Sequence, residues 1–149
     1  MHSRSRDIEE VARLAVDVGF KLHRDLGPGL LESVYETVLE KSLVRLGLDV
    51  ERQKPVTFEF DGLVFLDAFR TDLVVENRLI IEIKSVDRLL PVHGKQLLTY
   101  LRLADKSLGL LMNFGAATFR EGLKRVVNEH TDFASSWLRV NQIPPQRAT

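Results

Sequence analysis

Apolar residues follow helical spacing at the start of the chain. From Asp7 to Leu26 they recur at three- and four-residue intervals and form one stripe, until Gly27-Pro28-Gly29 interrupts the pattern. A second helix is predicted from about Leu30 to Leu46, with Gly47 as its stop. Its buried side is expected to hold these residues or their near neighbours: Leu31, Val34, Val38 and Leu39.

The middle of the chain alternates between apolar and polar residues, which is typical of strands with one buried face. Four strand segments are predicted, at residues 56–60, 63–69, 71–75 and 79–84. Asp61-Gly62 between the first two segments is a strong hairpin signal, and a second short turn is expected at 76–78.

The rest of the chain predicts a third helix and two further strands. Pro91 opens a helix that extends to about Leu103, because proline is tolerated in a first helical turn. Residues 108–114 are apolar on both faces and indicate a covered strand. Residues 123–128 fit a strand or a helix, and we assign them to a strand. Two helices, three or four strands, a helix and a strand, in this order, predict an α/β domain whose mixed sheet is flanked by helices.

Length and composition fit a single domain. The 149 residues suffice for one full hydrophobic core, expected at about 7–128, with a C-terminal tail at about 129–149 that is loose beyond Asn141. Lys plus Arg equals Asp plus Glu, so the formal net charge is zero. This argues against a protein that coats DNA non-specifically, but it leaves room for a local basic groove. The absence of cysteine excludes disulfides, thiolate zinc sites and cysteine nucleophiles.

The sequence predicts no membrane segment. No apolar run approaches the ~20 residues that a spanning helix needs. The first ten residues are charged and lack the apolar centre of a signal peptide. A cytoplasmic protein is therefore expected.

The informative polar residues are Asp72, Glu82 and Lys84. Glu82 and Lys84 are two apart on one strand, so their side chains share a face. If the preceding turn centres near Asn77, Asp72 lies opposite Glu82, because direct cross-strand partners share a face. The opposite face is then purely apolar, with Leu73, Val75, Ile81 and Ile83.

Charged groups on an apolar sheet must be paired or must bind a metal ion. Mg²⁺ (or Mn²⁺) suits this set, since it takes carboxylate and carbonyl oxygens and water. Asp72 and Glu82 are the expected ligands, with the Ile83 carbonyl as a third, and Lys84 would hold or activate a water. The alternative is a structural ion-pair cluster, which a D…ExK pattern alone favours because such short patterns recur by chance.

Two helices supply further candidates. His93, Gln96 and Tyr100 share one face of the third helix and could line the same cleft, although His93 taken singly is better explained as a hydrogen-bonded structural residue. Gln96 and Tyr100 could instead make only surface or helix-to-sheet hydrogen bonds. In the second helix, Glu32 or Glu36 could complete the metal shell through a water.

These segments together resemble the GxxExxY proteins, a family assigned to the PD-(D/E)XK nuclease superfamily. The resemblance spans about residues 7–128. It rests on the following segments: Gly29-Leu30-Leu31-Glu32-Ser33-Val34-Tyr35, Arg70-Thr71-Asp72-Leu73-Val74-Val75, Ile81-Glu82-Ile83-Lys84-Ser85, Pro91-Val92-His93, Gln96-Leu97-Leu98-Thr99-Tyr100-Leu101 and Gly109-Leu110-Leu111-Met112-Asn113-Phe114-Gly115.

The resemblance implies a restriction-endonuclease-like αβββαβ core with its site at the open edge of the sheet. It implies Asp72, Glu82 and Lys84 as the superfamily triad, and a helical glutamate, Glu32 or Glu36, as an extra acidic residue. Gln96 and Tyr100 resemble the QxxxY element that helps position nucleic acid in RecB-type and Cas4-type nucleases. Thr71 stands where the superfamily's namesake proline would precede Asp72, a departure that weakens the motif without breaking it.

The first hypothesis is therefore a nuclease that hydrolyses phosphodiester bonds of nucleic acid through a metal-activated water. The second is a non-catalytic module that keeps the fold and binds nucleic acid or a protein partner. A third is a structural or oligomerising protein whose polar cluster only ties strands together. Nucleic acid is the expected partner, and the sequence leaves open DNA versus RNA, endo- versus exonuclease action and a homodimer.

Overall fold

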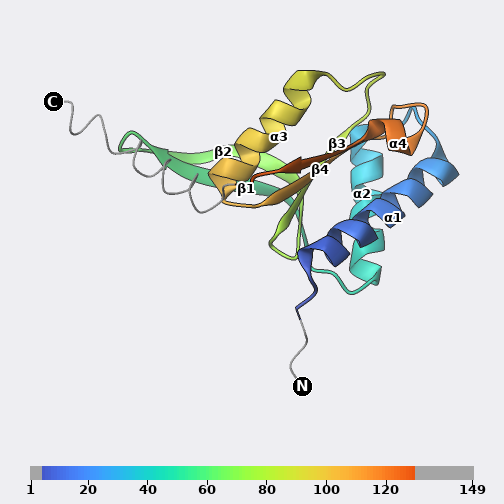
Figure 1. The fold of residues 1–149 in the computed structure, drawn as a ribbon, viewed down its shortest axis with the longest axis horizontal. Helices are drawn as coiled ribbons and strands as arrows, with labels where there is room; N and C mark the ends of the chain where they lie inside the picture. Colours follow the sequence, from blue (N-terminus) through green and yellow to red (C-terminus); the bar gives the residue numbers. More distant parts are fainter. Residues whose placement is uncertain (1–4, 130–149) are drawn as a thin grey trace.

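The computed structural model describes residues 5–129, and Figure 1 shows their arrangement. The elements are α1 (Ile8–Leu26), α2 (Glu32–Arg45), β1 (Val50–Phe60), β2 (Leu63–Val75), β3 (Leu79–Lys84), α3 (Pro91–Ala104), β4 (Leu108–Asn113), α4 (Phe119–Gly122) and β5 (Leu123–Val127). The expected tail beyond Asn141 lies outside the described residues. Within residues 5–129, none of the helices combines the length and apolar character needed to cross a membrane.

The strands form one mixed sheet in the order β1-β2-β3-β4-β5. Neighbouring strands are antiparallel except β3 and β4, which run parallel and are joined by the crossover helix α3. A parallel pair needs such a long connection, whereas short turns join β1 to β2 and β2 to β3, and a loop with the one-turn helix α4 joins β4 to β5. The predicted α/β fold with a mixed sheet flanked by helices is therefore confirmed.

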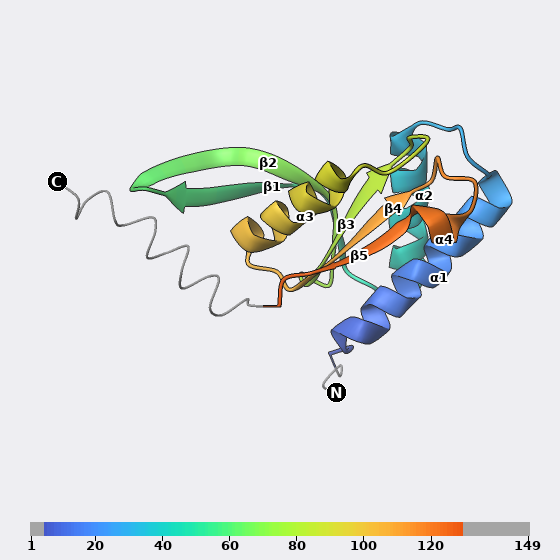
Figure 2. The same cartoon turned by 45° about the horizontal axis from the view of Figure 1, so that its top comes forward.

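Helices cover both faces of the sheet, with α3 on one side and α1 and α2 on the other (Figure 2). Leu73, Ile81 and Met112 belong to the core under α1 and α2, whereas Val74 and Ile80 pack under α3. Successive residues of β2 and β3 thus point into different cores, as the alternation of strand side chains requires. This arrangement buries β3 and β4 on both faces.

The second helix is shorter and turned differently from the prediction. It begins at Glu32, and Leu31 is the residue before its first turn. Leu31 and Val34 are exposed, by 74% and 38%, so the expectation that they are buried is wrong. Leu39 is buried as predicted, and Tyr35, Leu43 and the charged Glu36 complete the buried side. Glu36 can lie inward because two polar side chains of β1 bond to it.

The hairpin also differs from the prediction. Segments 63–69 and 71–75 form one strand, since Arg70 between them still pairs with Pro55. β1 begins at Val50, because the polar residues before Val56 continue the ladder with β2. The pairing also contains a bulge that the sequence did not predict, where the register shifts between Val56 and Phe58.

Beyond this bulge β1 and β2 form a two-stranded arm that extends past the other strands (Figure 1). Pairing of β2 with β3 reaches only from Val75 to Leu73 in the backbone ladder. The end of the arm exposes several large apolar side chains: Phe60, Leu63, Val64, Phe65 and Leu66. The β5 strand was correctly predicted, whereas the one-turn helix α4 before it was not.

Candidate active site

The pairing of β2 with β3 continues beyond its backbone ladder through side chains. Backbone pairing ends at Leu73 opposite Ile81. One position further, the Asp72 amide donates to Glu82 Oε1 at 3.1 Å, and the Ile83 amide donates to Asp72 Oδ2 at 2.8 Å. Asp72 and Glu82 therefore meet where β2 leaves β3, in the register that the sequence predicts.

Glu82 is a buried carboxyl group beside two other charges. Its burial and the negative charge of Asp72 raise the pKa of Glu82 from 4.5 to about 8, although the Asp72 amide and the Lys84 ammonium act in the opposite direction. Without a cation, this carboxyl group holds a proton at neutral pH. The structure thus brings Asp72, Glu82 and Lys84 together, as the sequence suggested.

Tyr100 of α3 lies close to the same carboxylates. Its ring stacks on Phe69 of β2, with centroids 4.2 Å apart and an angle of 10° between the rings. Burial raises the pKa of the Tyr100 hydroxyl, and the charges of Glu82 and Asp72 raise it further. Tyr100 therefore stacks on Phe69 and lies near enough to Glu82 and Asp72 for their charges to affect the pKa of its hydroxyl.

The two other polar residues of this helix face have different surroundings. His93 Nδ1 accepts a hydrogen bond from the Leu90 amide at 3.0 Å and so closes the first turn of α3. This confirms the structural explanation of His93. Gln96 is exposed one helical turn before Tyr100. Tyr100 is thus the residue of this face that the structure places beside the acidic pair.

A cleft of about 170 Å³ lies between α2 and the acidic pair. It is lined by Glu32, Ser33, Glu36, Gln53, Asp72 and Ile83. Glu32 is exposed in the first turn of α2, whereas Glu36 is buried one turn later. Both helical glutamates that the sequence singled out therefore face the cleft that contains Asp72.

Glu36 is held by two residues of β1 that the sequence did not indicate. Arg52 Nε donates to Glu36 Oε2 at 2.8 Å, and Gln53 Nε2 donates to Glu36 Oε1 at 2.6 Å. The same Gln53 nitrogen lies 3.2 Å from Asp72 Oδ1 and donates to it. Both oxygens of Glu36 thus have donors, and Asp72 is bonded at both of its oxygens.

Counting residue pairs back from the hairpin turn is the sequence-based way to find the residue opposite Asp72. Here that count gives the wrong residue, because the register shifts within the hairpin. Phe58 pairs with Phe65, so unbroken pairing would put Val56 opposite Asp67, but Val56 pairs with Phe69. This shift of two residues carries Gln53 from a position opposite Arg70 to one opposite Asp72. A bulge of this kind is not visible in the alternation of apolar residues.

Asn113 at the end of β4 fixes the loop that follows Lys84. Its Oδ1 accepts from the amides of Val86 and Gly115, both at 3.0 Å, and its Nδ2 donates to the Val86 carbonyl at 2.8 Å. A Cβ at Gly115 would come within 2.3 Å of the Val86 oxygen, so glycine is needed at this crossing. The buried Asn113 therefore ties the loops after β3 and β4 to each other.

Replacing Asn113 with alanine should lower the free energy of unfolding by about 2–4 kcal/mol, because it leaves two amides and one carbonyl without their partners. Asn113→Asp keeps the acceptor for the two amides but sets a buried carboxylate oxygen against the Val86 carbonyl, so it should also lower the free energy of unfolding. Urea unfolding followed by circular dichroism measures both variants. Equal unfolding midpoints for Asn113→Ala and the wild type would contradict this role.

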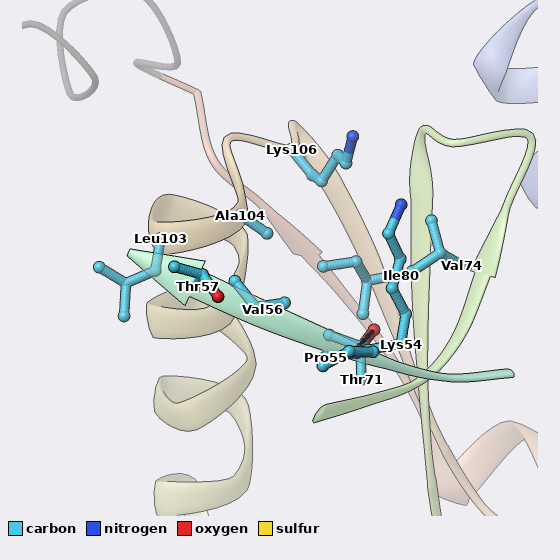
Figure 3. Close-up of a pocket in the computed structure, with 10 residues that line it drawn as sticks. All are labelled: Lys54, Pro55, Val56, Thr57, Thr71, Val74, Ile80, Leu103, Ala104 and Lys106. Atoms are coloured by element: carbon cyan, nitrogen blue, oxygen red, sulfur yellow. Dashed lines mark hydrogen bonds between the residues drawn. The ribbon is translucent and has the colours of Figure 1, made fainter. Parts of the chain in front are cut away.

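A second hollow, of about 210 Å³, lies between β1 and the end of α3 (Figure 3). The ammonium groups of Lys54 and Lys106 both donate to Asn77 Oδ1, at 3.3 and 3.2 Å. Burial lowers the pKa of Lys106, and the charge of Lys54 lowers it further. Within residues 5–129, none of the residues that line this hollow carries a carboxylate, whereas Glu32, Glu36 and Asp72 line the other cleft.

The acidic site fits a hard divalent cation with few protein ligands. Across residues 5–129, no three or more His, Asp or Glu side chains are grouped in a way that could hold a metal ion. Mg²⁺ is ordinarily held by one or two carboxylates and keeps several waters. Asp72 and Glu82 supply two such carboxylates. A bound cation would also reduce the free-energy cost of ionising the buried Glu82.

Comparison with known proteins agrees with this arrangement. No curated protein and no solved structure is significantly similar to the chain. A family model described as the PD-(D/E)XK nuclease superfamily matches residues 9–126, which include every strand except the last residue of β5. The chain belongs to the PD-(D/E)XK nuclease superfamily.

Proposed function

We propose that this protein hydrolyses phosphodiester bonds of nucleic acid with the help of Mg²⁺ or Mn²⁺. The observation that supports this most strongly is the pair of carboxyl groups, Asp72 and Glu82, bonded across the end of two strands with Lys84 beside them. Membership of a nuclease superfamily supports the same reaction class. Acidic residues that converge on a strand end are suited to a cation and its phosphate ligand.

Each group has a distinct proposed role. Asp72 and Glu82 would hold the cation, with the Ile83 carbonyl as a third ligand, and Glu32 or Glu36 would act from the neighbouring cleft. When bound, the cation would supply Lewis-acid stabilisation of the phosphate and a more acidic water. Lys84 would orient the attacking water and offset the negative charge that develops on phosphorus oxygens.

Tyr100 and Gln96 are proposed to contact the nucleic-acid strand. The stack on Phe69 supports this role of Tyr100, because a ring that is already ordered would lose little freedom on contact with a strand. Gln96 is exposed on the same helix face and is free to turn towards a strand. Together they would place a phosphate near Asp72 and Glu82.

We also propose that the chain belongs to the GxxExxY branch of the superfamily. The contacts of its Gly29 to Tyr35 segment support a structural reason for this motif. Tyr35 Oη donates to the Gly27 carbonyl at 2.5 Å and accepts from the Leu30 amide at 3.2 Å. The tyrosine thus fixes the turn before α2, and Glu32 of the motif faces the acidic cleft.

Lys84→Ala should reduce metal-dependent cleavage by at least ~100-fold, because it removes the positive charge that meets the developing negative charge. Cleavage of single- and double-stranded DNA and RNA would be measured with Mg²⁺ and with Mn²⁺. Lys106→Ala is the matched control, since Lys106 lies at the other hollow and should leave cleavage unchanged.

Two results would argue against the proposal. Equal cleavage by Lys84→Ala and the wild type would assign the activity to other groups. A folded wild-type protein that binds neither Mg²⁺ nor Mn²⁺ would favour the alternative of a non-catalytic nucleic-acid- or partner-binding module.

A further inference from the structure

We propose that Gln53 is a positioning residue that holds Asp72 and Glu36 in the geometry needed for cation binding. This inference rests on the proposed function, because it concerns the same acidic site. Among residues 5–129, no side-chain hydrogen bond joins Gln53 to strand β3 or to the crossover helix α3. Its side-chain amide instead connects one carboxylate of β2 to one carboxylate of α2.

The backbone at Gln53 is unusual for a strand. Its φ is 50°, in the left-handed region that non-glycine residues rarely adopt. The ladder is intact on both sides of it, since Arg52 pairs with Leu73 and Lys54 pairs with Thr71. Backbone strain that is kept within an otherwise regular ladder is commonly associated with a functional position.

This backbone geometry accounts for a pair of contacts that a regular strand would not be expected to make. Neighbouring residues of a regular strand point to opposite faces. Arg52 and Gln53 nevertheless both donate to the carboxylate of Glu36. The left-handed residue turns the Gln53 side chain to the same side as Arg52, where it also meets Asp72.

The consequence is a chain of fixed groups from α2 to the acidic pair. Arg52 fixes one oxygen of Glu36, Gln53 links the other oxygen to Asp72 Oδ1, and the Ile83 amide fixes Asp72 Oδ2. A carboxylate oxygen can accept more than one bond, so Asp72 keeps acceptor sites for a cation. Hydrogen bonds that orient a ligand in this way raise metal affinity by 10- to 100-fold in typical metal sites, as a rough guide.

The test compares Gln53→Met with the wild type by calorimetric titration of Mn²⁺. Methionine has a similar length and cannot donate, so the expected result is a dissociation constant roughly 10- to 100-fold higher. The neighbouring Lys54→Met is the matched control. The Lys54 ammonium bonds to Glu51 and Asn77, so this variant removes no contact of the acidic site and should bind Mn²⁺ as the wild type does. Urea unfolding of all three proteins separates lost affinity from lost stability.

The outcomes distinguish this inference from the proposed function. If Gln53→Met binds Mn²⁺ as tightly as the wild type, or if Lys54→Met loses as much affinity, the positioning role is wrong while the metal site stands. If the wild type binds no Mn²⁺, the proposed function fails and this role with it. Side-chain amide signals in ¹H–¹⁵N spectra of the metal-free protein then still test the bridge, since Glu36→Gln should shift those of Gln53 and an unchanged signal would show that the bridge is absent.

Discussion

Glu82→Gln should make the metal-free protein more stable at pH 8 and should remove most of its dependence on pH. The pKa of Glu82 is about 8 in the folded protein, compared with 4.5 for an ordinary glutamate. Between these values the folded state holds a proton that the unfolded state has released. The contribution of Glu82 to stability is therefore fully present below about pH 4.5 and is lost as the pH rises towards 8.

The shift corresponds to an upper limit of about 5 kcal/mol, and we expect a measured change on the order of 3 kcal/mol. Glutamine is neutral at every pH and keeps an oxygen that can accept from the Asp72 amide. Urea unfolding in EDTA from pH 5 to 8.5 measures the effect, with the exposed Glu59→Gln as control. A wild-type stability that stays level over this range would contradict the raised pKa.

The same proton links cation binding to pH. If Glu82 is a ligand, a cation must displace its proton, so affinity for Mn²⁺ should rise between pH 6 and 8 by up to roughly tenfold per pH unit. Binding heats measured in buffers with different ionisation enthalpies would reveal the released proton. Glu82→Gln should bind Mn²⁺ weakly at every pH and release none.

The second large effect is expected at Tyr35. Tyr35→Ala should lower the free energy of unfolding by about 3–5 kcal/mol, because it empties a fully buried ring position. The ring stacks on Phe114 with centroids 4.5 Å apart and an angle of 6°, and its hydroxyl bonds to the turn before α2. Loss of this residue therefore affects both the core and the segment that carries Glu32.

Two further variants divide this effect into its parts. Tyr35→Phe keeps the stack and loses the hydroxyl, so the expected loss is only about 1–2 kcal/mol. Tyr100→Ala removes the chain's other tyrosine, which is half-buried, and should cost less than Tyr35→Ala. Urea midpoints rank the three variants. If Tyr35→Ala proved no more harmful than Tyr100→Ala, the motif tyrosine would not have the structural role assigned to it.

The acidic pair was predictable from sequence because it depends on two local rules. Alternation places Glu82 and Lys84 on one face, and a short turn at Asn77 sets Asp72 opposite Glu82. Both rules depend only on residues close together in sequence, so distant contacts have little influence on them. The mixed sheet was predictable for a related reason, since the order of helical and alternating segments admits few arrangements.

The supporting residues could not be predicted because they depend on contacts distant in sequence. The inward position of Glu36 requires donors from β1, and those donors reach it only because of the left-handed backbone at Gln53. The wrong prediction for Leu31 and Val34 has the same origin. Helical periodicity fits more than one apolar stripe on this helix, and the contacts of Tyr35, Leu39, Leu43 and Glu36 with the rest of the fold decide which stripe is buried.

The β1–β2 arm divides the molecule into parts with different tendencies to open. Its outer end is a ribbon of two strands with little cover, and such ribbons are at most marginally stable by themselves. Its base, on the inner side of the bulge, carries Gln53 and Asp72 at the edge of the doubly covered sheet. Local unfolding of the ribbon can therefore reach the acidic site before the rest of the sheet is disturbed, and any ligand that tightens this base would also suppress the fraying of the arm.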